Sequence, residues 1–389
     1  MMKKVVGNSQ YQKLANALLI LQLLRKGPNT RVSIARELGL QPSTVTYNIN
    51  RLLEAGLVRQ ATARELLQKD KEAPIALGRR AIALELNCDF GRVIGLELLA
   101  DSGWASILDP SGTVLYSQSV DYPAPSGKTA QERFEHLIET VVAQMVEKCA
   151  GYKVLGVGIA LPGIVEPNGQ VIRDCWTHAL KGTDLSRYFK MNYDFPVILE
   201  NDANCCVQRY LFEGAAERRD NFMYLLARSY PMSHVPTGVS PFGIGLGLVF
   251  DGNLYRGSDS RAGEFMSALM PVKQTGTQLS VSIQDAHDIA TDAHIRLSVL
   301  RELVANIRSL ASVLDPHGIY LGGFISDYFD EVVTLLSDEL SQKVIFTNGH
   351  TDASEGAAVN LLSLLYRIPQ VGDESPYVHL TSLFQESIS

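Results

Sequence analysis

The sequence lacks a membrane segment and a disulfide pattern. No apolar run reaches the roughly 18 residues that a membrane-spanning helix needs. The apolar N-terminal stretch is interrupted by Gln22 and is not followed by a small-residue cleavage site, which favours a helix over a signal peptide. The five cysteines are odd in number and form no C-x-x-C pair. A chain of 389 residues with these properties is expected to contain two or three domains and to carry reduced thiols in the cytoplasm.

Positive charge is concentrated in the N-terminal part of the chain. Residues 1–80 contain 14 Lys and Arg against five Asp and Glu, a net charge of +9, whereas the remaining residues carry −16. The net charge of −7 hides this contrast. A basic N-terminal part on an acidic body is typical of a nucleic-acid-binding module joined to a domain of another kind.

The basic part has the pattern of a helix-turn-helix. Apolar residues at helical spacing predict a first helix that ends at Gly27-Pro28-Asn29. Thr30 is placed to cap a short second helix, and Gly39 supplies the turn after it. Pro42 suits the start of a third helix over about 42–55. The apolar positions of the first and third helices are Leu14, Ala17, Leu18, Leu21, Leu24, Val45, Ile49, Leu52 and Leu53.

The third helix is expected to enter the DNA major groove. Its polar residues are assigned to the surface away from the core, where Ser, Thr and Asn can meet base edges and an Arg can meet a phosphate. These residues are Ser43, Thr44, Tyr47, Asn48 and Arg51. A wing is expected next, with one strand after Gly56 and a second near Ile75–Leu77 or Ala81–Leu86. Arg79 and Arg80 follow Gly78 and fit either a minor-groove contact or a solvated turn.

From about residue 90 the pattern changes to alternating strands and helices, which predicts a two-lobed α/β domain with a cleft. Asp352 and Glu355 form a capping-box pattern before the last apolar run. We expect a DNA-binding domain at 1–86, a first lobe at 87–204 plus 352–389, and a second lobe at 205–351. The expected strands are Arg92–Leu99, Trp104–Leu108, Thr113–Val120, Val154–Ala160, Val197–Glu200, Phe222–Ala227 and Gly243–Phe250, with a long helix at Thr129–Cys149.

Five segments, in this order and spacing, resemble the ROK family (repressors, open reading frames and kinases) of the actin-like sugar kinase superfamily. With the helix-turn-helix, they resemble its repressor branch, which includes regulators of N-acetylglucosamine, glucose and xylose genes. The segments are Leu161-Pro162-Gly163, Glu200-Asn201-Asp202-Ala203-Asn204, Gly243–Gly247 followed by Asp251–Gly257, Ala262-Gly263-Glu264, and Asp315–Gly323. The resemblance implies a winged helix-turn-helix followed by a two-lobed, ROK sugar-kinase-like α/β domain.

The resemblance also allows a test for catalysis. A first phosphate loop resembling D-x-G-G-T is replaced by Glu97-Leu98-Leu99-Ala100-Asp101. Glycines let the backbone approach phosphate oxygens closely, and the leucines fill that space. In the second loop, Phe242 stands where the family has a small hydroxylic residue. We therefore expect no ATP, no cofactor and no catalytic residue, with Asp202 as the relict of the family's base.

The same resemblance suggests effector contacts. Asn201, Asp202 and Glu264 match sugar-contacting positions, although Asp202 is also placed to cap the helix that follows it. His178 and Trp176 fit either the pocket lining or ordinary packing. The family's zinc ligands are absent: Ser267 stands at the His position, and residues 268–284 contain no cysteine, so no metal site is expected.

These features together predict a sugar-responsive transcriptional regulator, more specifically a repressor of carbohydrate genes. It would act as a homodimer or a dimer of dimers on a palindromic operator in double-stranded DNA, with a carbohydrate as effector. Two alternatives stay open. One is an active ROK sugar kinase with Asp202 as its base, and the other is a regulator that responds to a protein partner in place of a sugar.

Overall fold

The N-terminal head is a winged helix-turn-helix. The computed structural model describes residues 8–61, 82–122, 126–213, 220–230, 235, 238–270, 276–347 and 349–368. Within the head, the three strands pair antiparallel in the order β1-β3-β2. Its elements are α1 (Asn8–Arg25), β1 (Asn29–Thr30), α2 (Arg31–Leu38), α3 (Pro42–Glu54), β2 (Val58–Gln60) and β3 (Ala83–Leu86).

The local signals of the head appear in the structure as predicted. The Thr30 hydroxyl accepts a hydrogen bond from the Ser33 amide at 3.2 Å and caps α2. Gly39 ends this helix with φ at 64°, a left-handed conformation that favours glycine. Pro42 is the first residue of α3. The second wing strand is β3; the alternative strand at 75–77 lies outside the described residues.

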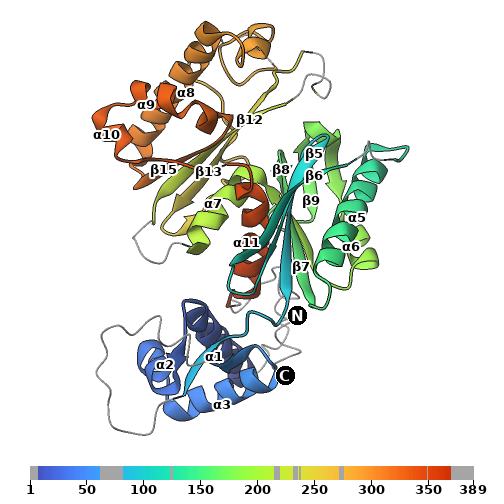
Figure 1. Cartoon of the computed structure of the whole chain (residues 1–389), viewed down its shortest axis with the longest axis vertical. Helices are drawn as coiled ribbons and strands as arrows, with labels where there is room; N and C mark the ends of the chain where they lie inside the picture. The colour runs from blue at the N-terminus through green and yellow to red at the C-terminus, as the bar shows by residue number, and fades with distance from the viewer. Residues whose placement is uncertain are drawn as a thin grey trace, which may run out of the picture.

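The body begins with a five-stranded mixed sheet in the order β11-β7-β4-β5-β6. Strands β4, β7 and β11 run parallel, whereas β5 and β6 extend the sheet as an antiparallel meander. The strands are β4 (Arg92–Leu98), β5 (Ser102–Leu108), β6 (Val114–Asp121), β7 (Val154–Leu161) and β11 (Val197–Asn201). Helices α5 (Ala130–Lys148) and α11 (Asp352–Leu365) cover its two faces (Figure 1).

A second five-stranded sheet follows in the order β14-β13-β12-β15-β16. Its strands are β12 (Phe222–Ser229), β13 (Phe242–Phe250), β14 (Asn253–Leu254), β15 (Gly318–Gly323) and β16 (Val344–Phe346). Its helices are α8 (Ala293–Leu314), α9 (Phe329–Leu335) and α10 (Asp338–Ser341), with short turns η3 (Asp285–Asp288) and η4 (Phe324–Tyr328). A small sheet with α6 (Ser186–Asn192) and η1 (Trp176–His178) completes the body; its strands are β8 (Ile164–Val165), β9 (Val171–Cys175) and β10 (Leu180–Asp184).

Helix α7 (Asp202–Glu213) packs along α11 between the two large sheets (Figure 1). The capping box predicted at the start of α11 is wrong. Asp352 is already inside the helix, after Thr351, and its carboxylate accepts hydrogen bonds from Arg209, Tyr210 and Tyr224. A carboxylate held by three tertiary donors is not available to cap its own helix. Among the described residues, no helix is long and apolar enough to cross a membrane.

Candidate functional site

The exposed surface of α3 carries most of the residues assigned to DNA contact. Ser43 and Tyr47 are exposed, and Thr44 and Arg51 are partly exposed. The Arg51 guanidinium donates a hydrogen bond to the Tyr47 hydroxyl at 3.3 Å, and the Lys13 ammonium lies 5.4 Å from the centre of the Tyr47 ring. The Tyr47 ring is therefore flanked by two cations on a helix face that is free to meet DNA.

The assignment of Asn48 to the DNA-facing surface is corrected by its burial. Only 2% of its surface is exposed, and its side-chain amide donates to the Thr44 carbonyl at 2.8 Å. On a helix Asn48 lies one turn from Leu52, which puts it on the buried side and not with Tyr47. Asn50 is exposed instead and accepts a hydrogen bond from Arg31 at 3.3 Å. Its spacing of seven residues from Ser43 could have placed it on the outer face. Arg79 and Arg80 lie outside the described residues.

Asn201, Asp202 and Glu264 come together in the body, where they line one cavity of about 390 Å³. Strand β11 carries Asn201 to the cavity, and α7 starts directly after it with Asp202. Glu264 reaches the cavity from the segment after β14 and forms a bridge with Gly245 of β13. The other lining side chains include two cations, one amide and three aromatic rings: Arg228, Arg261, Gln278, Trp176, Tyr230 and Phe242.

The cap of α7 is Asn201, not Asp202 as the sequence suggested. The Asn201 side-chain oxygen accepts the Asn204 amide at 3.0 Å, and its nitrogen donates to the Gly163 carbonyl at 3.1 Å. The Asp202 carboxylate accepts a hydrogen bond from the neighbouring Ala203 amide at 2.9 Å and lies 3.9 Å from the Arg228 guanidinium. Burial raises the pKa of Asp202, and it also raises the pKa of Glu264. Asp202 is thus a carboxylate held at the cavity wall.

Arg228 is a charged cavity residue that the sequence did not predict. It is the penultimate residue of β12. Its guanidinium forms an ion pair with Glu97 of β4 and lies 3.9 Å from the Asp202 carboxylate. The sequence contains one signal for it, because Arg228 is a cation that directly follows the apolar run Phe222–Ala227. Its partner Glu97 lies 131 residues earlier in the chain and is fully buried. A cation at this strand end therefore joins two acidic positions from different elements.

Stability should fall with rising pH through Glu97. Burial raises the pKa of this carboxyl to about 7, from an ordinary value of 4.5 for a glutamic acid side chain. The folded chain therefore binds this proton more tightly than the unfolded chain, and stability decreases as pH rises between these values. Between pH 5.5 and 8 the loss should be about 2 kcal/mol more for the wild type than for Glu97→Gln, as measured by urea unfolding. Parallel pH profiles for the two proteins would contradict this assignment.

His178 does not line the cavity, so its predicted role in effector binding is corrected. Its Nε2 lies 3.1 Å from the Leu98 carbonyl oxygen, and its ring packs 4.8 Å from the Phe134 ring. Burial lowers the pKa of His178 to about 4, which keeps the imidazole neutral near pH 7. Trp176, two residues earlier, does line the cavity, with its ring set edge-on 5.0 Å from Tyr230. Trp176 and His178 are the first and last residues of η1, and this difference in position places only the Trp176 ring at the cavity.

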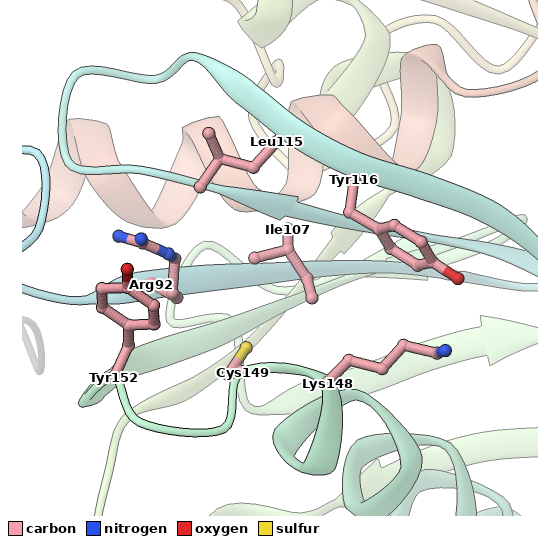
Figure 2. Close-up of a pocket in the computed structure, with 7 residues that line it drawn as sticks. All are labelled: Arg92, Ile107, Leu115, Tyr116, Lys148, Cys149 and Tyr152. Carbon is pink, nitrogen blue, oxygen red and sulfur yellow. The ribbon is translucent and has the colours of Figure 1, made fainter.

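A second cavity, of about 270 Å³, lies over the end of α5 (Figure 2) and contains no predicted site residue. Arg92 stacks there on Tyr152, with 3.5 Å between its guanidinium carbon and the ring centre. The same guanidinium donates to the Cys88 and Gly91 carbonyls, both at 2.8 Å. Arg92 therefore fixes the segment between head and body. The lining residues are Arg92, Ile107, Leu115, Tyr116, Lys148, Cys149 and Tyr152.

No group of three or more His, Cys, Asp or Glu residues in the described part of the chain is placed to hold a metal ion. Ser267, at the position where the family often has a zinc-binding His, is buried. Its hydroxyl accepts hydrogen bonds from the Asn306 side chain at 3.0 Å and from the Leu269 amide at 3.1 Å. This position therefore has a local hydrogen-bonding role.

Comparison with known proteins gives two domain matches. Residues 93–277 match the model of the ROK family, and residues 16–61 match a helix-turn-helix domain. The xylose repressor of Bacillus spizizenii is 25% identical over 366 residues, which cover 86% of this chain and 88% of the repressor. The DNA-binding transcriptional dual regulator NagC of Escherichia coli is 22% identical over 263 residues, 67% of this chain and 58% of NagC.

Solved structures share the fold. A ROK family transcriptional regulator described as a homolog of the E. coli MLC protein matches with a TM-score of 0.66 and 16% identity, over 97% of this chain and 99% of that one. The ROK hexokinase of Thermus thermophilus matches with a TM-score of 0.51 and 22% identity, over 69% of this chain and 97% of the hexokinase. The kinase thus matches a smaller share of the chain than the regulator does.

Proposed function

Because the chain carries a ROK family domain behind a helix-turn-helix domain, we propose that it is a transcriptional repressor of carbohydrate genes that responds to a sugar or sugar derivative. The observation that carries the proposal is the convergence of Asn201, Asp202 and Glu264 on one cavity in the body of a chain with a DNA-binding head. The regulators among its relatives, named for xylose and N-acetylglucosamine, support the same reading.

The cavity has the chemistry of a carbohydrate site. The carboxylates of the cavity can accept hydrogen bonds from sugar hydroxyls. The guanidinium groups of Arg228 and Arg261 can donate hydrogen bonds to the sugar oxygens. Trp176 and Tyr230 offer aromatic surface to the apolar faces of a sugar ring. Asp202 and Glu264 then serve as hydrogen-bond acceptors, with no chemical step assigned to them.

Three features favour binding over phosphoryl transfer. Arg228 already neutralises Glu97 and faces Asp202, the two acidic positions that a kinase would use. Leu98 is buried at the end of β4, where the family's first phosphate loop begins. In the second loop, Gly243 and Gly245 are paired with β12 as part of a regular strand. Open backbone amides are what a phosphate loop requires, and a paired strand offers fewer of them.

The head is proposed to act as a pair. One recognition helix reads few base pairs, so a two-fold dimer on a palindromic operator supplies the specificity that a repressor needs. A dimer of dimers would serve in the same way. Such a protein works where the chromosomal DNA is, which for a bacterial regulator is the cytoplasm.

The proposal is tested with the full chain and DNA upstream of its own gene. We expect salt-sensitive binding to one palindromic site, and a change in that affinity with one member of a panel of pentoses, hexoses and amino sugars. Thermal shift of the free protein against the same panel identifies the sugar, since a ligand at 100 times its Kd adds about 2.7 kcal/mol. Absence of any preferred site would reject the repressor. A preferred site with no sugar response would favour control by a protein partner.

A kinase is distinguished by ADP release in the presence of ATP and each sugar. The proposal expects none. Turnover that disappears in Asp202→Asn would establish the kinase instead, because this substitution removes only the charge and the proton-accepting ability of the side chain.

The DNA-facing surface of α3 yields a separate prediction. Arg51→Ala should weaken binding at all sequences alike and reduce the slope of log K against log salt by about 1, because a phosphate contact is lost. Tyr47→Ala and Ser43→Ala should change base preference at particular positions. Arg308→Ala removes an equal charge from the exposed surface of α8 and is the control. Equal, sequence-blind losses from all three head variants would mean that the recognition surface lies elsewhere.

A further inference from the structure

Helix α7 runs from the cavity to the DNA-binding head. Asp202, its first residue, lines the cavity. Phe212, in its last turn, contacts α1 of the head. Twelve residues of α-helix span about 18 Å, so one rigid element joins the two sites. A change at the cavity wall therefore has a short structural path to the head.

The contact at the far end of α7 is specific. The Arg25 guanidinium carbon lies 3.8 Å from the centre of the Phe212 ring, and Arg25 donates a hydrogen bond to the Phe212 carbonyl at 3.3 Å. Arg25 is the last residue of α1. A cation is favoured at a helix C-terminus, where carbonyl groups carry partial negative charge, and over an aromatic face. Both preferences depend on where the end of α7 is placed.

A second contact of α1 is made with α11. The Gln22 side chain, one turn before Arg25, donates to the Tyr366 carbonyl at 2.8 Å. Tyr366 follows the last residue of α11, and its hydroxyl donates to the Pro110 carbonyl at 2.7 Å in the turn between β5 and β6. Helix α1 thus rests on the C-terminal ends of α7 and α11 together. The apolar core of the head is continuous with Leu361, Leu362 and Leu365 of α11.

Helices α7 and α11 are fastened to each other. Arg209 of α7 forms ion pairs with Asp352 and with Glu355, the latter at 2.8 Å. Gln208 donates to Asn360 at 3.4 Å. Gly356 lets the two backbones approach so closely that a Cβ there would lie 1.8 Å from the Cys205 carbonyl oxygen. Movement of α7 relative to α11 would break several of these contacts, so the pair is expected to move as a unit.

We propose that Arg25 is a positioning residue that couples the occupancy of the cavity to the orientation of the helix-turn-helix head, through its contact with the C-terminal end of α7. Gln22 acts alongside it at the end of α11. The inference rests on the proposed function for the identity of the effector. It goes beyond that function by assigning the structural connection between the cavity and the head. This connection runs through α7 to Arg25 and involves residues outside both the cavity and the recognition helix.

The test compares full-length wild type, Arg25→Ala and Lys26→Ala. Lys26 is exposed, is one residue away and carries the same charge, so it controls for charge near the DNA. The measured quantity is the ratio of DNA Kd values with and without the effector sugar. Allosteric couplings are typically about 5- to 150-fold. We expect a ratio in this range for wild type and Lys26→Ala, and a ratio near 1 for Arg25→Ala.

A structural role alone would not give this pattern. Sugar affinity and DNA affinity without sugar should each stay within about threefold of the Lys26→Ala values. Phe212→Leu, which keeps an apolar side chain and removes the aromatic face, should reduce the ratio in the same direction. An unchanged ratio in Arg25→Ala would overturn the inference.

A second measurement separates this inference from the proposed function. Coupling between two sites is reciprocal, so DNA binding should alter hydrogen exchange at the first turn of α7. The probe is the duplex selected from a random library, with no sugar present. We expect the change in wild type and its loss in Arg25→Ala. An equal change in both proteins would overturn the inference, whereas absence of a sugar response in wild type would count against the proposed function alone.

Discussion

Arg228→Met is expected to lower the free energy of unfolding by about 3–5 kcal/mol at pH 8, because it leaves the buried Glu97 carboxylate without its counter-ion. Glu97 is fully buried in β4, and its other neighbour in the cavity wall, Asp202, carries the same sign of charge. Methionine retains most of the apolar volume of the arginine stem, so the loss reports mainly on charge. At pH 5.5 the loss should be smaller, since a protonated Glu97 has no charge to compensate.

Urea unfolding of three variants checks this result. Arg173→Met removes a surface ion pair, with Glu166 at 3.1 Å and Arg173 44% exposed, and should cost less than about 1 kcal/mol. The double variant Arg228→Met with Glu97→Gln removes both charges and should recover part of the loss. An Arg228→Met cost no greater than that of Arg173→Met at pH 8 would refute the view that Arg228 holds the acidic cluster together.

Local chemistry made most of the head predictable. A hydroxyl before the helix, a glycine after it and a proline at the start of the next helix each act within a few residues, and Thr30, Gly39 and Pro42 lie where these rules put them. Asn48 was misplaced for a different reason. A polar residue type predicts exposure, but an Asn can be buried when its side-chain amide donates to the carbonyl one turn back, here that of Thr44.

The cavity was predictable only where the family resemblance provided an order of motifs. Asn201, Asp202 and Glu264 meet in one cavity although more than 60 residues separate Asp202 from Glu264 in the sequence. No spacing rule links Arg228 to Glu97, because β12 and β4 belong to different sheets. His178 and Trp176 lie in one short turn and point to different surroundings. Such choices depend on tertiary packing, which residue type alone does not encode.

Gly356→Ala should be strongly destabilising, by about 2 kcal/mol or more, even though alanine is the better helix former by about 1 kcal/mol. The new Cβ would lie 1.8 Å from the Cys205 carbonyl oxygen of α7, a backbone atom that cannot turn aside. Either α7 and α11 separate or the α7 backbone bends. Thermal or urea unfolding measures the cost, and Ser363→Ala, a half-buried site in the same helix, is expected to have little effect.

The same substitution also connects stability to regulation. If α7 and α11 transmit the state of the cavity as a unit, forcing them apart at Gly356 displaces Asp202 at one end of α7 or Phe212 at the other. At a temperature where Gly356→Ala is still folded, its DNA affinity should therefore respond to the effector sugar less than the wild-type affinity does. A destabilised variant with a full sugar response would show that the close approach of the two helices serves packing only, and that coupling to the head takes another route.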